Sequence, residues 1–480
     1  MSEQTQSAPT RLKAGVARCD ITPPVGIAHG NWSAQAHQRA EGVDLPLTCT
    51  ALAASDGQES IILAEWELLY TLDGEALAQA RARISALTGV PADHIRLSAA
   101  HNHAGPSLRQ PWFEEGAEMV APYLDSLPDR LAGACLAAWR AMRPARIAAA
   151  TGQSMVNCNR RLPWQPGRPL MTVNPGGFAD HDVIVARIDD ETGQPIAVLV
   201  NFAAHPTILS YDNRLISPDY PGTLRRVVES LTGATCLFLQ GAAGNQGNIC
   251  DYTNQVEMAR WVGRQLGLEA VRVAETIHTR PGARQIVKQV ESSWTMGVTG
   301  YVADPLADEA ALSTVSSRVR QLSLPRWERQ PPSAAETENV QALQARLADL
   351  HRQQAPVEQV REANLTVRRA LLELETTRRR AEPGPIRLEL QAIRLGPLAL
   401  LSMPVEPFAE IGAAIKAGSP FAATMVSGYS NGMLGYMPIA EAYPEGGYEI
   451  WMTPFAPEAA GMVVEAGVSL LAELHAAPAG

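Results

Sequence analysis

The amino-acid sequence predicts an α/β fold, with one large domain built on central mixed β-sheets and a helical hairpin inserted into it. Short apolar runs alternate with helical stretches from Gly15 to about Arg280, which is the pattern of an α/β domain. Strand-like alternation resumes after residue 385, so apolar strands stand on both sides of a helical segment. With 480 residues, of which 46% are apolar, the chain can bury a sizeable core. We therefore expect one interrupted domain and not two domains.

The elements follow in order along the chain. Residues 1–10 are expected to form a disordered tail, and residues 11–475 the domain. The insertion spans about 305–382, where prolines interrupt segments rich in Glu, Arg, Gln, Ala and Leu. Four of its apolar residues fall on one helical face: Val340, Leu343, Leu347 and Leu350. Such a hairpin could cover a site, mediate contacts in a homo-oligomer, or be solvated without either role.

Composition excludes several classes of protein. The net charge of −10, from 40 basic and 50 acidic residues, argues against a nucleic-acid partner, which needs a basic face. The first residues lack the apolar core of a secretory signal, and no segment approaches 18 continuous apolar residues. We therefore expect a cytoplasmic protein without stable membrane insertion. The six cysteines form no Cys-x-x-Cys pair, so neither a disulfide framework nor a thiolate zinc site is predicted.

Five apolar, strand-like runs each end in a polar or glycine-rich loop. The runs are His94–Ala100, Ile196–Ala204, Thr235–Leu239, Leu398–Met403 and Phe421–Ser427. The loops after them carry His101, His205, the stretch 240–248, Glu406 and Tyr429. Ligands of α/β folds gather at the carboxyl ends of strands. These five loops therefore predict one shared site.

The His101-Asn102-His103 step is the sharpest local feature of the sequence. In extended backbone, residues i and i+2 point the same way, so both rings could face one pocket. Neutral imidazole is the commonest metal ligand, and a catalytic zinc keeps about three protein ligands and an open position. Spacing alone makes both histidines candidate ligands, although histidines with packing roles also occur in such pairs.

Three further residues are candidates, each with an ordinary alternative. A single histidine at a strand end, such as His205, is more often a hydrogen-bonded structural residue. Glu406 lies between two prolines after an apolar strand, where a glutamate is rarely buried unpaired, and its alternative is a surface turn. The alternative for Tyr436 is a half-buried tyrosine near a loop. The glycine-rich stretch 241–248 matches no phosphate-binding spacing, so it is interpreted as a tight turn.

Five segments of the chain are similar to blocks of one known family. They are AGVARCDITPP (14–24), SAAHNHAGP (98–106), NFAAH (201–205), PVEPF (404–408) and NGMLGY (431–436). From about Gly15 to Pro457 the sequence resembles the catalytic N-terminal domain of the neutral/alkaline (non-lysosomal) ceramidase superfamily. The last two segments fall in the order in which that family carries its Glu and Tyr ligands.

Carried over residue by residue, the resemblance implies one zinc ion per chain. The implied ligands are His101, His205, Glu406 and Tyr436. His103 would then lie behind the ligands or face the substrate, as a donor to the oxyanion or to the leaving amine. Arg160 resembles part of the Asn-Arg pair that lines the family's pocket, and could anchor a carboxylate or another polar oxygen. The implied catalytic residues are His103, Arg160 and Tyr436.

Three departures from the family argue against ceramide as the substrate. The family's GDVSPN loop holds a serine, whereas residues 244–248 read GNQGN here. The family's C-terminal immunoglobulin-like domain and its frequent secretory signal have no counterpart in this sequence. We therefore expect a substrate that is smaller and more polar than ceramide.

The predicted function is that of a zinc-dependent amidohydrolase. It would cleave the C–N bond of a small, polar N-acyl substrate by attack of metal-bound water, whose pKa zinc lowers to about 7. A zinc-dependent esterase or lactonase would use the same site. A catalytically inactive binding protein of this fold is a third alternative, and zinc binding without turnover would distinguish it. The expected partner is in each case a small molecule.

Overall fold

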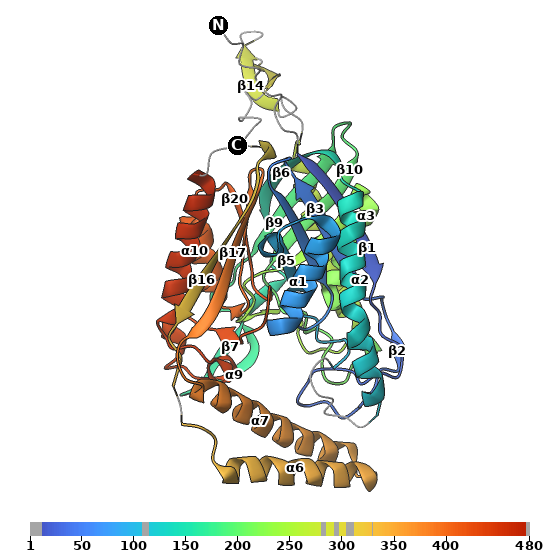
Figure 1. Cartoon of the computed structure of the whole chain (residues 1–480), viewed down its shortest axis with the longest axis vertical. Helices are drawn as coiled ribbons and strands as arrows, with labels where there is room; N and C mark the ends of the chain where they lie inside the picture. Colours follow the sequence, from blue (N-terminus) through green and yellow to red (C-terminus); the bar gives the residue numbers. More distant parts are fainter. Residues whose placement is uncertain are drawn as a thin grey trace.

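The computed structural model describes residues 12–107, 115–279, 285–291, 297–303, 312–328 and 330–476. The tail expected at residues 1–10 lies outside these ranges. Most of the described chain is arranged in layers around two β-sheets, with helices on the outside (Figure 1). This arrangement confirms the predicted α/β class with mixed sheets.

The larger sheet has eight strands and mixed direction. In spatial order they are β12 (Thr235–Gln240), β10 (Pro195–Phe202), β9 (Asp182–Asp190), β6 (Arg143–Gln153), β1 (Lys13–Asp20), β3 (Thr48–Ser55), β4 (Ser60–Trp66) and β5 (Ile95–Ala99). The pairs β10–β12 and β4–β5 are parallel, and the other neighbours are antiparallel. Parallel pairing places the carboxyl ends of both partners at the same edge of the sheet.

The second sheet has four strands. They are β16 (Val315–Leu324), β17 (Ile386–Leu395), β18 (Leu398–Ser402) and β20 (Ala423–Ser427), of which β18 and β20 are parallel. One apolar cluster joins the two sheets, since Leu52 and Leu63 of the larger sheet pack with Leu398 and Met425 of the smaller one. The alternate side chains of the same strands point to the helices, because successive residues of a strand face opposite sides.

Helices cover both outer faces, which gives four layers in the order α, β, β, α (Figure 1). The larger sheet is covered by α1 (Gly74–Thr88), α2 (Val120–Arg140), α3 (Asp219–Thr232) and α4 (Val256–Thr276). The smaller sheet is covered by α8 (Ala409–Gly418) and α10 (Ala459–Ala476). Burying one face of every helix and both faces of each sheet is what turns the alternating sequence pattern into a single core.

Within the described chain, α10 is one helix long and apolar enough to cross a membrane, with a mean hydropathy of 1.3 over 18 residues. Its buried residues include Val463, Leu470 and Leu471, which pack on the smaller sheet. A core helix has the same composition, so this feature is weak evidence for a membrane span.

The helical hairpin is shorter than the predicted insertion of about 305–382. It consists of α6 (Ala334–Arg352) and α7 (Val357–Ala381), which pack through Leu347, Val360 and Val367 at one end of the molecule (Figure 1). Ser333 begins α6 with a capping box to Glu336. Residues 315–324 form strand β16 and not a helix, so the helical part begins only after residue 330.

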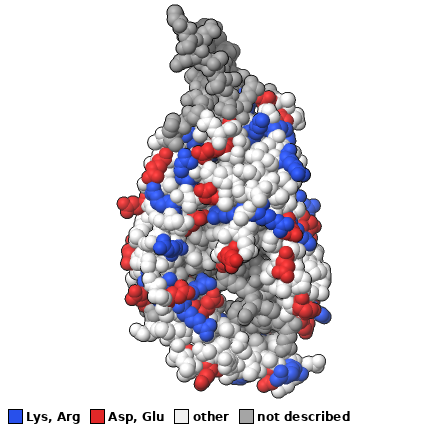
Figure 2. All heavy atoms as spheres, viewed as in Figure 1, with Lys and Arg blue, Asp and Glu red and all other residues white. Residues whose placement is uncertain are grey.

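The remaining elements are short. Three two-stranded sheets pair β2 (Gly42–Val43) with β11 (Leu215–Ile216), β14 (Gln285–Glu291) with β15 (Gly297–Ala303), and β19 (Glu406–Pro407) with β21 (Tyr436–Met437). A three-stranded sheet contains β13 (Gln246–Asn248), β7 (Asn157–Gln165) and β8 (Arg168–Asn174). The described chain also contains helix α9 (Tyr448–Met452) and the 3-10 turns Ala92–His94, Ala117–Met119 and Ala440–Ala442. On the face shown in Figure 2, acidic and basic side chains are interspersed.

The loops that follow the five predicted strands meet at the junction of the two sheets. All five apolar runs are strands, namely β5, β10, β12, β18 and β20. The Ala99 amide donates a hydrogen bond to the carbonyl of Tyr429 at 3.0 Å, and the Gly244 amide donates one to the carbonyl of Pro407 at 2.8 Å. Both distances are typical of N–H···O hydrogen bonds. Loops from both sheets are therefore bonded to one another around one position.

Candidate metal centre

His101 follows β5 and is held in an unusual backbone conformation. Its φ is 63°, in the left-handed region that a residue with a Cβ seldom adopts, and its side chain is 2% exposed. The ring Nδ1 lies 2.8 Å from the carbonyl oxygen of Leu69. A carbonyl can only accept, so Nδ1 carries the proton and Nε2 is left with a lone pair. The structure therefore presents His101 in the tautomer that binds a metal through Nε2.

His205 follows β10 and is fixed in the same manner. Its Nδ1 lies 2.6 Å from the carbonyl oxygen of Ala243, and its side chain is fully buried. The Asn248 amide donates to the carbonyl of His205 at 2.6 Å. Burial and the nearby Arg160 lower the pKa of His205 to about 3, which favours the neutral ring. The glycine-rich stretch 241–248 is a turn, as the sequence predicts, that leads into strand β13 (Gln246–Asn248), and its backbone orients His205 through the carbonyl of Ala243.

Glu406 brings a carboxylate to the two histidines. It lies on β19, and its parallel partner across the ribbon is Tyr436 on β21. One oxygen, Oε2, lies 3.2 Å from Nε2 of His205 and 3.3 Å from Nε2 of His101. Burial opposes ionisation of this carboxyl, but the two histidines outweigh burial and hold its pKa well below the usual range.

These three groups fit a metal ion. Both Nε2 atoms and the carboxylate oxygen are acceptors when the Nδ1 protons are in place, and acceptors about 3 Å apart repel one another unless a proton or a cation lies among them. Histidine nitrogen and carboxylate oxygen are also the donor set that zinc takes in catalytic sites. The donor chemistry thus agrees with the sequence expectation for His101, His205 and Glu406.

His103 lies closer to this group than the sequence expectation required. Its Nε2 is 3.3 Å from Nε2 of His101, and the ligand atoms of His101, His103 and His205 all lie within 4.8 Å of one another. Its ring packs against Trp32 with centroids 4.8 Å apart. Burial, with His101 and His205 nearby, lowers the pKa of His103 well below its usual value. The three histidines together could bind a metal, so geometry returns His103 to the candidate ligands.

Arg160 lies behind Tyr436 and orients it. The Arg160 guanidinium donates to the phenol oxygen of Tyr436 at 3.1 Å and to Glu449 at 3.0 Å. Its side chain is nearly fully buried. These contacts favour a positioning role for Arg160 over the expected direct anchoring of a substrate carboxylate. Burial raises the pKa of Tyr436 well above its usual value, so the phenol keeps its proton in the absence of a cation.

A pocket opens beside the cluster and is closed on one side by α7. One cavity of about 110 Å³ is lined by Asn31, Ser33, Leu69, Tyr70, His101, His103, Arg368, Leu372, Glu375, Glu406, Tyr436 and Tyr448. A neighbouring cavity of about 70 Å³ shares Tyr70, Leu372, Glu375, Glu406, Tyr436 and Tyr448 with it. The helical insertion therefore forms part of the candidate site.

Several residues of this site carried no usable sequence signal. Trp32, Tyr448 and Arg368 come from segments that follow no predicted strand, so strand-end reasoning could not find them. Tyr429 lies in a loop that the sequence did single out, and its ring is 4.3 Å from that of His101 between centroids. Its contact with the His101 ring became visible only with the fold.

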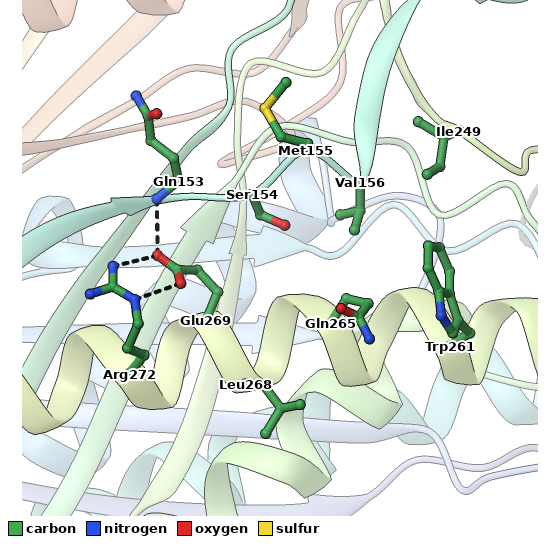
Figure 3. A pocket seen from close by; sticks show the side chains of 10 residues that line it. All are labelled: Gln153, Ser154, Met155, Val156, Ile249, Trp261, Gln265, Leu268, Glu269 and Arg272. Atoms are coloured by element: carbon green, nitrogen blue, oxygen red, sulfur yellow. Dashed lines mark hydrogen bonds and ion pairs between the residues drawn. The ribbon is translucent and has the colours of Figure 1, made fainter.

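A larger pocket lies elsewhere on the surface, between the turn that joins β6 to β7 and helix α4 (Figure 3). Its volume is about 550 Å³, and it shares no lining residue with the cavities at the histidines. Met155, Trp261 and Leu268 give it an apolar wall, and the charged residues in view, Glu269 and Arg272, are paired with each other at 2.7 Å. It brings together no group suited to catalysis, so size does not make it the candidate active site.

The fold and the cluster define an α/β protein with a buried histidine and carboxylate group that could hold a metal ion. Two solved structures share this fold: neutral ceramidase from Pseudomonas aeruginosa, with a TM-score of 0.67 and 18% identity over 98% of this chain and 75% of that chain, and a ceramidase complexed with C2, with a TM-score of 0.67 and 18% identity over 98% and 76%. At this level of identity the similarity shows the fold.

Sequence comparison identifies relatives of the same kind. Neutral ceramidase A of Dictyostelium discoideum is 27% identical over 177 residues, which are 34% of this chain and 24% of that protein. Neutral ceramidase B of the same organism is 26% identical over 138 residues, 27% of this chain and 19% of that protein. The aligned segments thus span a quarter or less of these curated relatives. No protein-family model matches the chain. These similarities confirm the resemblance to the neutral ceramidase superfamily that the sequence motifs indicate.

Proposed function

We propose that this chain is a zinc-dependent hydrolase that cleaves the amide bond of a small, polar N-acyl compound. The observation that carries the proposal is the convergence of two fixed Nε2 atoms and one carboxylate oxygen, 3.2 and 3.3 Å apart, beside a pocket. The similarity to proteins called neutral ceramidases supports hydrolysis of an N-acyl bond.

In this proposal His101, His205 and Glu406 hold the zinc ion. Tyr436, which the family resemblance implies, and His103, which the geometry adds, are the candidates for the next position. When bound, zinc supplies a Lewis acid that polarises a carbonyl and lowers the pKa of water to about 7. The backbone carbonyls of Leu69 and Ala243 keep both ligand rings in the required tautomer.

The other residues of the pocket bind, orient and move protons. Tyr436, oriented by Arg160, can donate a hydrogen bond from its phenol to the carbonyl oxygen that becomes negative. Such donors stabilise the oxyanion and supply a large part of the rate enhancement in amide hydrolysis. If His103 does not bind the metal, its neutral ring can accept the proton of the attacking water and pass it to the leaving amine, which needs one as the C–N bond breaks. Helix α7 and Tyr448 limit the access of bulk water to these groups.

The size of the pocket supports a small substrate. The two cavities measure about 110 and about 70 Å³, whereas pockets for drug-sized ligands measure about 300–1,000 Å³. A two-chain lipid would need much more room. The polar side chains Asn31, Ser33 and Glu375 in the lining also favour a polar compound.

The test combines metal analysis with a hydrolysis panel. We expect one zinc ion per wild-type chain, and loss of both zinc and turnover in His101→Ala. His475→Ala, which removes an exposed histidine far along the chain, is the matched control and should change neither. The panel contains N-acyl amino acids, N-acyl sugars, small amides, lactones, esters and a short-chain ceramide.

Each outcome of this test is decisive for one part of the proposal. One zinc ion per chain in His101→Ala would refute the ligand assignment. Rapid turnover of the ceramide would refute the argument from pocket size. Turnover of esters or lactones alone would replace the amidase by an esterase or lactonase, and stoichiometric zinc without any turnover would favour a binding protein.

A further inference from the structure

Helix α7 places an arginine on the wall of the candidate active site. Arg368 is 3% exposed and lines the same cavity as His101, His103, Glu406 and Tyr436. The residues of α7 that line the two cavities are Arg368, Leu372, Glu375, Thr376 and Arg379. Their spacing of about one helical turn puts them on one face of α7, so the helix presents this face to the site.

The position of this arginine is fixed because α7 is bound along its length. Near its start, the Asn364 amide donates to the carbonyl of Gln35. Near its end, the Arg380 guanidinium donates to the carbonyls of Thr453 and Ile450, each at 2.9 Å. Arg368 lies between these two attachments, so its backbone is held at the pocket and its guanidinium can be preorganised for a ligand.

The charge of Arg368 favours an anionic ligand. Burial lowers the pKa of Arg368 to about 9, so the guanidinium is still protonated near neutral pH at the wall of the cavity. A guanidinium matches a carboxylate with two parallel hydrogen bonds, so a ligand carboxylate that enters this cavity can bind Arg368.

We propose that Arg368 binds a carboxylate of the substrate, so that the compound cleaved is a small N-acyl amino acid. The reaction then consumes one water: the amide C–N bond breaks, a C–O bond forms at the acyl carbon, and the proton of water passes to the leaving amine. The products are a carboxylic acid and a free amino acid. The reaction rests on the proposed function, whereas recognition of the carboxylate by Arg368 does not.

Binding of a matched pair of probes tests the recognition. Calorimetric titration with N-acetylglycine and with its neutral amide, N-acetylglycinamide, compares ligands that differ in the carboxylate alone. We expect the wild-type protein to bind the carboxylate about 10- to 200-fold more tightly, the range for a hydrogen bond to a charged group. Arg368→Met should abolish this preference, and Arg368→Lys should keep part of it.

The matched control is Arg361→Met, which removes another arginine of α7. Arg361 pairs with Asp212 at 2.7 Å outside the lining of both cavities, so this variant should bind as the wild type does. Equal binding of the two probes by the wild-type protein overturns the inference, and so does a preference that survives Arg368→Met. If Arg368→Met does not fold, the wild-type comparison and Arg368→Lys still decide.

Turnover of the same two compounds separates this inference from the proposed function. Preference for the carboxylate in binding, without turnover of either compound, would refute the hydrolase and leave the recognition by Arg368 standing. Equal turnover of both compounds by wild type and Arg368→Met would support the hydrolase and refute the inference. We expect turnover of the carboxylate to fall in Arg368→Met mainly through a raised KM.

Discussion

Arg96 joins the two sheets through hydrogen bonds and lies on β5, the strand that leads to His101. It is fully buried and donates hydrogen bonds to four serine hydroxyls. These are Ser402 at 2.6 Å, Ser98 at 2.8 Å, Ser427 at 2.6 Å and Ser430 at 2.8 Å. Three of the four serines belong to β18, β20 or the loop after β20, in the smaller sheet and its extension. Replacement of Arg96 by Met therefore tests what holds the sheets in register.

The structure sets the size of the expected loss. Each hydrogen bond to a charged group contributes about 1.5–3 kcal/mol, but the substitution also removes a charge whose burial lowers its pKa to about 9. Breaking a buried charged network usually costs about 3–5 kcal/mol. Ser427 and Ser430 still donate to the carbonyls of Gln240 and Gly428, at 2.8 and 2.7 Å. We therefore expect Arg96→Met to lower the free energy of unfolding by about 3 kcal/mol.

Urea unfolding followed by circular dichroism measures this loss. Ser402→Ala removes one of the four bonds and should cost less than Arg96→Met, which gives a graded series. The dependence of the free energy on urea should stay unchanged if only stability is altered. If Arg96→Met unfolds at the same urea concentration as the wild type, the network does not stabilise the sheet junction and the reasoning fails.

Two further predictions concern Tyr436 and Asp219. Tyr436→Phe should lower kcat about 10²–10³-fold with a small change in KM, as loss of an oxyanion donor does, and zinc content distinguishes a donor from a ligand because a ligand variant loses the metal. Burial raises the pKa of Asp219 from 3.8 to about 7, so the folded state binds its proton more tightly than the unfolded state and stability falls as pH rises from about 4 to about 7. The loss is at most about 4 kcal/mol. Asp219→Asn should flatten this decline in urea unfolding at about pH 5 and about pH 8, and an unchanged slope would contradict it.

The part of the site that could be predicted from sequence is the part that follows strands. His101, His205 and Glu406 come after apolar runs, and the parallel pairs β4–β5, β10–β12 and β18–β20 bring such ends to common edges. The sequence could not show that the edges of two separate sheets meet, which depends on the packing of Leu52 and Leu63 against Leu398 and Met425.

Other parts escaped prediction for physical reasons. The sequence predicts helix where strand β16 forms, because polar residues interrupt its apolar ones and prolines follow it, so that no apolar run marks the strand. Arg368 reaches the pocket only because α7 is attached to residues 35 and 450–453, far away in sequence. Contacts of this length leave no periodic pattern.

The candidate centre takes its ligands from both sheets. His101 and His205 follow strands of the larger sheet, and Glu406 follows a strand of the smaller one. A bound ion would thus act as a cross-link between two halves of the core, and removing it would release a constraint on folding as well as on chemistry. A free metal concentration 100 times its Kd would add about 2.7 kcal/mol to the free energy of unfolding. Substitutions that change substrate specificity should therefore be tolerated better in α7, which lines the pocket but provides no candidate ligand, than in either sheet.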